Sequence, residues 1–152
     1  MQANVERITI QGSAQLPASA GATPTNIAVL GPMPQDGAWT ITGSITAVDT
    51  AAVPSGRSAR SAVVFYPQFE GVSIAGVATR LDSYGSAVAT PPMACQPQDR
   101  GLAGFGFVVP NPVDLVTVGT NSVQLQVTGP GAGVELTWAY DLVLSKTTLI
   151  SP

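Results

Sequence analysis

Apolar and polar residues alternate one by one along much of this chain. Successive side chains of a β-strand point to opposite faces, so such alternation gathers the apolar side chains on one face. The pattern is clearest in the segments 39–47, 123–128 and 134–144. A helix would spread the same apolar residues around its circumference. The alternation therefore predicts strands, and it places a row of hydroxyls opposite the apolar face of the first segment, at Thr40, Thr42, Ser44 and Thr46.

Further strands are predicted by shorter segments, which bring the total to about nine, a pattern typical of sandwiches and barrels. These segments are Val5–Gln11, Asn26–Leu30, Ala62–Tyr66, Val72–Thr79, Phe105–Val109 and Val113–Val118. Ala62–Tyr66 is apolar throughout, which predicts a strand buried on both faces and ended by Pro67. The Gly-rich connection 129–133 joins two alternating segments, which predicts a hairpin over residues 122–144.

The fold class follows from these strands and from the absence of a helical stripe. Gly or Pro interrupts most of the chain, and both residues destabilise a helix interior. We expect an all-β protein with one domain over residues 1–152, an antiparallel β-sandwich of jelly-roll-like form. An immunoglobulin-like sandwich is the alternative, because periodicity does not reveal strand order. Long loops are predicted at 16–25, 49–61 and 83–101, and long loops in compact domains are often functional.

Charged residues are scarce, at 10% of the 152 residues, against about 25% in a typical soluble domain. The chain has 6 Lys and Arg, 9 Asp and Glu, one Cys and no His. So few cations cannot neutralise many phosphates, which argues against a nucleic-acid partner. No apolar run approaches the length of a membrane helix, and the charged start, with Glu6 and Arg7, does not read as a signal peptide. One Cys allows no internal disulfide.

Catalytic chemistry finds little support in the residue types present. Without His, neither a serine nor Cys95 has its usual base, and Lys146 is the one lysine available for a Ser–Lys pair. The carboxylates are not paired by any spacing, and Asp82 and Asp99 adjoin arginines, which predicts local ion pairs with Arg80 and Arg100. No run of acidic residues resembles a calcium loop. We therefore expect no enzyme activity, no cofactor and no metal site.

The remaining feature is the surface. Trp39 and Trp138 lie on the apolar stripes of their strands, so we expect both in the core rather than on a sugar-binding platform. With the apolar residues assigned to strand faces, the outer faces and loops are left with small uncharged side chains. Such a surface packs closely against protein neighbours because little charge must be desolvated. The candidate interface residues lie in or beside the long loops: Val53, Arg57, Arg60, Tyr84, Met93 and Leu102.

The segment Asn121–Leu144, with its alternating stretches 121–129 and 134–138, resembles segments of small virion proteins of tailed bacteriophages, together with the overall Ala/Gly/Thr/Val-rich texture. The resemblance is to head decoration and other capsid-associated β-sandwich proteins. It implies a non-enzymatic subunit of the virion, assembled in the host cytoplasm, that forms homo-oligomers such as a trimer and packs against the major capsid protein or other virion proteins. The alternatives are a carbohydrate- or cell-surface-binding module and a self-assembling jelly-roll coat protein.

Overall fold

The computed structural model describes residues 1–50, 62–81, 95–100, 112–129 and 135–151. These residues form two β-sheets and one short 3-10 helix, η1 (Ala18–Ala20), with no α-helix among them. The strands are β1 (Gln2–Leu16), β2 (Thr25–Val29), β3 (Gly37–Asp49), β4 (Ala62–Ile74), β5 (Val77–Leu81), β6 (Cys95–Arg100), β7 (Val113–Val118), β8 (Ser122–Val127) and β9 (Leu136–Ile150).

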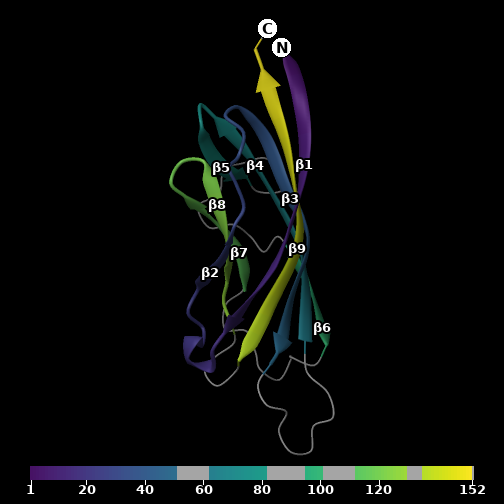
Figure 1. The fold of residues 1–152 in the computed structure, drawn as a ribbon, viewed down its shortest axis with the longest axis vertical. Coiled ribbons are helices and arrows are strands. Elements are labelled where there is room, and N and C mark those ends of the chain that lie inside the picture. Colours follow the sequence, from purple (N-terminus) through teal and green to yellow (C-terminus); the bar gives the residue numbers. More distant parts are fainter. Residues whose placement is uncertain (51–61, 82–94, 101–111, 130–134, 152) are drawn as a thin grey trace, which may run out of the picture.

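The two sheets form the predicted antiparallel β-sandwich (Figure 1). The larger sheet has the order β1-β9-β3-β4-β5, and β6 also pairs with β4. The smaller sheet has the order β2-β8-β7, and every strand pair is antiparallel. The strands β1 and β9 extend beyond the smaller sheet at the end where both termini lie (Figure 1).

The core lies between the sheets and is built from the apolar stripes that the alternation predicts. Trp39, Ile41, Ile45 and Ala47 of β3 are buried, as are Leu136, Trp138, Leu142 and Leu144 of β9 and Val123, Leu125 and Val127 of β8. The core placement of both tryptophans is therefore confirmed. The Trp138 ring stacks on Phe65 of β4, with 6.0 Å between ring centroids.

The predicted hairpin over residues 122–144 is wrong. β8 pairs with β2 and β7 in the smaller sheet, whereas β9 pairs with β1 and β3 in the larger one. The connection between the two strands therefore passes from one sheet to the other. Each strand has one apolar face, and burying the two faces against each other across the sandwich satisfies the same alternation as a hairpin would.

Strand β4 differs from its prediction in three ways. It continues through Pro67 to Ile74 in an unchanged register, and the β3–β4 pairing is interrupted only between Thr42↔Gln68 and Ile45↔Phe65, where Pro67 has no N–H to donate. It is not buried on both faces, since Phe65 is buried and Tyr66 is 49% exposed. The predicted strand Val72–Thr79 is broken by a tight turn at Ala75-Gly76, and both turn residues have positive φ, at 49° and 80°, as a type I′ turn requires.

The loop and terminal regions also differ from expectation. The predicted loop 83–101 includes β6, which pairs with β4. The predicted loop 16–25 holds η1. β1 and β9 are both 15 residues long and pair over their full lengths, well beyond the predicted Val5–Gln11 and 134–144. The predicted strand Phe105–Val109 and most of the loop 49–61 lie outside the described residues.

Candidate functional site

The six predicted interface residues lie outside the described part of the chain: Val53, Arg57, Arg60, Tyr84, Met93 and Leu102. Their role as contacts stays a prediction. The surface that the structure does describe consists of the outer faces of the larger and the smaller sheet, the end of the sandwich that carries the termini, and the strand edges.

Residues considered for catalysis are dispersed and mostly engaged in local contacts. Lys146 donates a hydrogen bond from Nζ to the Pro32 carbonyl, at 3.0 Å. Asp141 accepts from Gln11 Nε2 at 3.0 Å, and Glu135 accepts from Gln15 Nε2 at 2.8 Å. Within the described ranges, no three His, Cys, Asp or Glu side chains come together in a way that could hold a metal ion.

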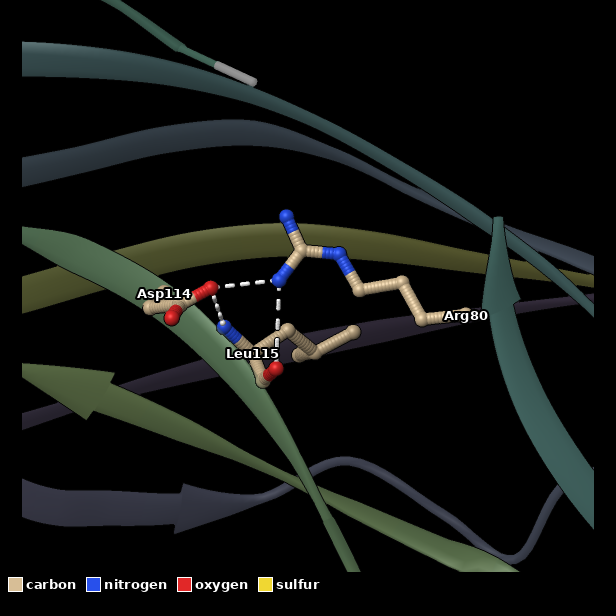
Figure 2. A network of polar contacts seen from close by, with 3 residues as sticks. All are labelled: Arg80, Asp114 and Leu115. Carbon is tan, nitrogen blue, oxygen red and sulfur yellow. Dashed lines mark hydrogen bonds and ion pairs between the residues drawn. The ribbon is translucent and has the colours of Figure 1, made fainter. Parts of the chain in front are cut away.

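The structure contains one buried polar network that the sequence pattern does not predict (Figure 2). Arg80 of β5 is 8% exposed and donates from one nitrogen to Asp114 Oδ1 of β7 and to the Leu115 carbonyl, the latter at 3.2 Å. The same Oδ1 accepts from the Leu115 N–H at 2.8 Å. The guanidinium also lies 4.6 Å from the ring centroid of Phe69. β5 and β7 belong to different sheets, so this ion pair ties the sandwich together.

We assign the network a structural role, because the buried Arg80 and the partly exposed Asp114 link the two sheets. The predicted partner of Arg80 was its neighbour Asp82, which lies outside the described residues. In the sequence, the burial of Arg80 is indicated by its spacing from Ala78, because the two residues share a face of β5. The spacing indicates this only when β5 is treated as a strand separate from β4, after the turn at Ala75-Gly76.

Exposed apolar side chains gather at the end of the sandwich that carries the termini. We call this surface the terminal tip and define it by seven residues: Met1, Val5, Ile74, Val77, Val118, Leu149 and Ile150. The strand registers bring them to one end, since Gln2 lies opposite Ile150, and Gly37 lies opposite both Thr148 and Ser73. The Ala78 N–H donates to the Thr120 carbonyl at 2.7 Å, which joins the β7–β8 turn to the same end.

Hydrogen bonds hold the backbone of the terminal tip in place, although its side chains face outward. Asp36 Oδ1 accepts from the Ala75 N–H at 3.1 Å, and the Gln35 carbonyl accepts from the Gly76 N–H at 2.8 Å. These contacts fix the β4–β5 turn against the start of β3. Ile74 is nevertheless 68% exposed and Val77 50% exposed. The sequence did not predict this grouping because its members come from five separate strands and the N-terminus.

The outer face of the larger sheet is largely uncharged. The hydroxyl row predicted on β3 lies there, beside Ala139, Asp141, Val143 and Ser145 of β9, of which only Asp141, opposite Ser44, is charged. Among the described aromatic side chains, Tyr66 alone is exposed. A sugar-binding platform is built from several exposed aromatic faces, so the described surface offers little basis for one.

No family model matches this chain, and no curated protein matches it. Among solved structures, the tailspike protein of the Acinetobacter phage vB_ApiP_P1 matches with a TM-score of 0.31 and 10% sequence identity. The match covers 95% of this chain and 22% of the tailspike chain. A TM-score this low does not establish a shared fold. The described residues contain no helix with the length and apolarity needed to cross a membrane.

Proposed function

We propose that this chain is a non-enzymatic structural protein of a virion, a decoration or stabilising subunit that packs against neighbouring shell proteins. The observation that carries the proposal is the terminal tip. Exposed apolar side chains that are grouped at one end of a molecule can form an interaction site. We expect a partner that contacts the tip also to cover part of the outer face of the larger sheet. That face carries few charges, so that little charge must be desolvated on contact.

The proposal also draws on the resemblance of Asn121–Leu144 to capsid-associated phage proteins and on the absence of His from the sequence. Its mechanism is mechanical. Each copy would bury its tip against the shell, and many copies on one particle would add avidity without any single strong contact. In this role each copy contacts other copies of the chain and the major capsid protein or other virion proteins. The protein is then located in the virion.

The test is to look for the chain in native particles and then to remove the tip. Immunogold electron microscopy with antibodies to the chain should label intact particles. The variant Ile74→Ser/Val77→Ser should still fold, because both side chains are exposed, and should lose most of its co-sedimentation with shells. Val29→Ser is the matched control, since Val29 is 60% exposed and lies on β2 in the smaller sheet, whereas Ile74 and Val77 lie in the larger one.

Two results would overturn the proposal. One is unlabelled particles. The other is a specific signal on a glycan array that disappears with Tyr66→Ala, which would instead favour the carbohydrate-binding alternative. Closed particles formed by the purified chain alone, visible by electron microscopy, would favour the self-assembling coat.

A further inference from the structure

The outer edge of β1 is a long row of backbone groups without partners among the described residues. β1 is 15 residues long, and it is paired on one side only, with β9. Strands in globular proteins usually run to about 10 residues at most. An exposed edge is a template for pairing with another chain, and proteins protect such edges with charged side chains, Lys above all, with Pro or with bulges. β1 contains no Pro and no Lys, its two charged residues are Glu6 and Arg7, and its register with β9 is uninterrupted over all 15 pairs.

The register identifies which backbone groups of β1 face outward. The Leu149 N–H donates to the Asp36 carbonyl at 2.9 Å, so the backbone groups of Leu149 face β3. Strand residues alternate in direction, and therefore the even-numbered residues of β9 face β1. They pair with the even-numbered residues of β1. The odd-numbered residues of β1 consequently direct both N–H and C=O to the free edge: Ala3, Val5, Arg7, Thr9, Gln11, Ser13 and Gln15.

We propose that this edge binds the same edge of a second copy, so that two larger sheets join through an antiparallel β1–β1 pair. The inference deepens the proposed function, because it assigns the surface through which the subunit associates with itself. Residues directly opposite in an antiparallel pair share a sheet face. A two-fold axis that relates two identical strands therefore passes between two copies of one residue. Thr9 is the midpoint of Gln2–Leu16, so an axis at Thr9 pairs every residue of both strands.

The side chains of β1 suit this Thr9-centred register. On the core-facing side, Ile8 lies opposite Ile10 of the second copy, which joins two half-buried apolar residues on each side of the axis. An axis at Glu6 or at Arg7 would instead oppose like charges, which is destabilising. In the Thr9-centred register, Glu6 lies opposite Gly12, and no like charges meet.

Charge complementarity supports the same register on the outer face. Arg7 lies opposite Gln11 of the second copy, and that Gln11 is the neighbour and hydrogen-bond donor of Asp141 in its own copy. Arg7 therefore lies in one row with the carboxylate of Asp141 of the second copy, two strands away. Arg7 has no charged partner among the described residues of its own copy. Because of the two-fold axis, this arrangement of Arg7 with Gln11 and Asp141 of the other copy occurs twice in the dimer.

The first test measures the mass of the full chain by light scattering during size-exclusion chromatography, over a range of concentrations. We expect a dimer. Thr9→Pro removes the two N–H groups that meet at the axis and should raise the dimer dissociation constant by about tenfold or more. Pro is tolerated on an edge strand where its nitrogen faces solvent. Thr9→Val keeps the N–H and a similar shape, and it should remain dimeric.

The second test reads the register and does not depend on a proline. In a Cys95→Ser background, Thr9→Cys should form a disulfide-linked dimer under mild oxidation, because opposed Cα atoms are about 5.5 Å apart. Arg7→Cys should not cross-link, since the two copies of residue 7 are four residues apart along the ladder, about 14 Å. A monomer at high concentration, a trimer, or a cross-link at Arg7→Cys but not at Thr9→Cys would overturn the inference. None of these results bears on whether the chain labels particles, so the two proposals fail separately.

Discussion

Removing Asp114 should destabilise this protein more than removing its partner Arg80, and removing both should cost less than removing Asp114 alone. The reason lies in unequal burial. The Arg80 side chain is 8% exposed and the Asp114 side chain 26% exposed. In Asp114→Ala the guanidinium stays between the sheets with only the Leu115 carbonyl and the face of the Phe69 ring to stabilise it. In Arg80→Met the carboxylate keeps its bond from the Leu115 N–H and can reach water.

The magnitudes follow from these environments. A buried charge left without its partner costs about 3–5 kcal/mol, and the remaining carbonyl and ring contacts place Asp114→Ala near the lower limit, at about 3 kcal/mol. Arg80→Met keeps the length and packing of the side chain and should cost about 1.5–2 kcal/mol, the lower part of the range for a hydrogen bond to a charged group. Replacing a buried pair by apolar groups is often neutral. The double variant Arg80→Met/Asp114→Ala should therefore recover stability relative to Asp114→Ala.

Urea unfolding followed by tryptophan fluorescence suits this measurement, because both tryptophans of the chain are buried in the core. A loss of about 3 kcal/mol should lower the urea midpoint by roughly 1–3 M at a typical slope for a domain of this size. All four proteins are compared at one concentration, so that self-association does not change the comparison. Additive losses, or Asp114→Ala costing less than about 1 kcal/mol, would refute the view that Arg80 is a buried charge dependent on Asp114.

Four further changes probe the core, the terminal tip and the β4–β5 turn. Gly71→Ala should lower the free energy of unfolding by about 1–3 kcal/mol and alter the near-ultraviolet circular dichroism, because an added Cβ would overlap the indole of Trp39; an unchanged spectrum would contradict this packing. Leu125→Ala, at a fully buried site, should cost about 2–5 kcal/mol in thermal unfolding. Leu149→Ala, at a site 45% exposed, should stay within about 0.5 kcal/mol of wild type, and equal losses at the two sites would contradict the assigned burial. Asp36→Ala removes the acceptor of a backbone N–H in the turn and should cost about 1 kcal/mol in urea unfolding; no loss would mean that the turn does not depend on that bond.

The candidate surfaces illustrate how far a sequence can guide the search for an interface. Composition and alternation together indicated that the outer faces carry little charge, and on β3 the outward residues are the uncharged hydroxyl row, with Asp141 of β9 opposite Ser44. The predicted contacts lie in loops, because long uncharged segments stand out in a sequence. The terminal tip and the β1 edge have no such local signal. Each member of the tip is a single apolar residue near a strand end, and only the registers bring these ends together.

By itself, the sequence determined the fold class, the inward face of most strands and the burial of both tryptophans, because these depend on the local two-residue period of a strand. Only the tertiary structure decided which sheet each strand joins. β8 and β9 have the same alternation whether they pair in a hairpin or face each other across a sandwich, and the structure has the second arrangement. It also decided that Arg80 pairs with Asp114, 34 residues away, because a buried charge takes its partner from whatever strand lies opposite. Burial and pairing between distant segments are properties of the packed sheets, and the local pattern of residues does not encode them.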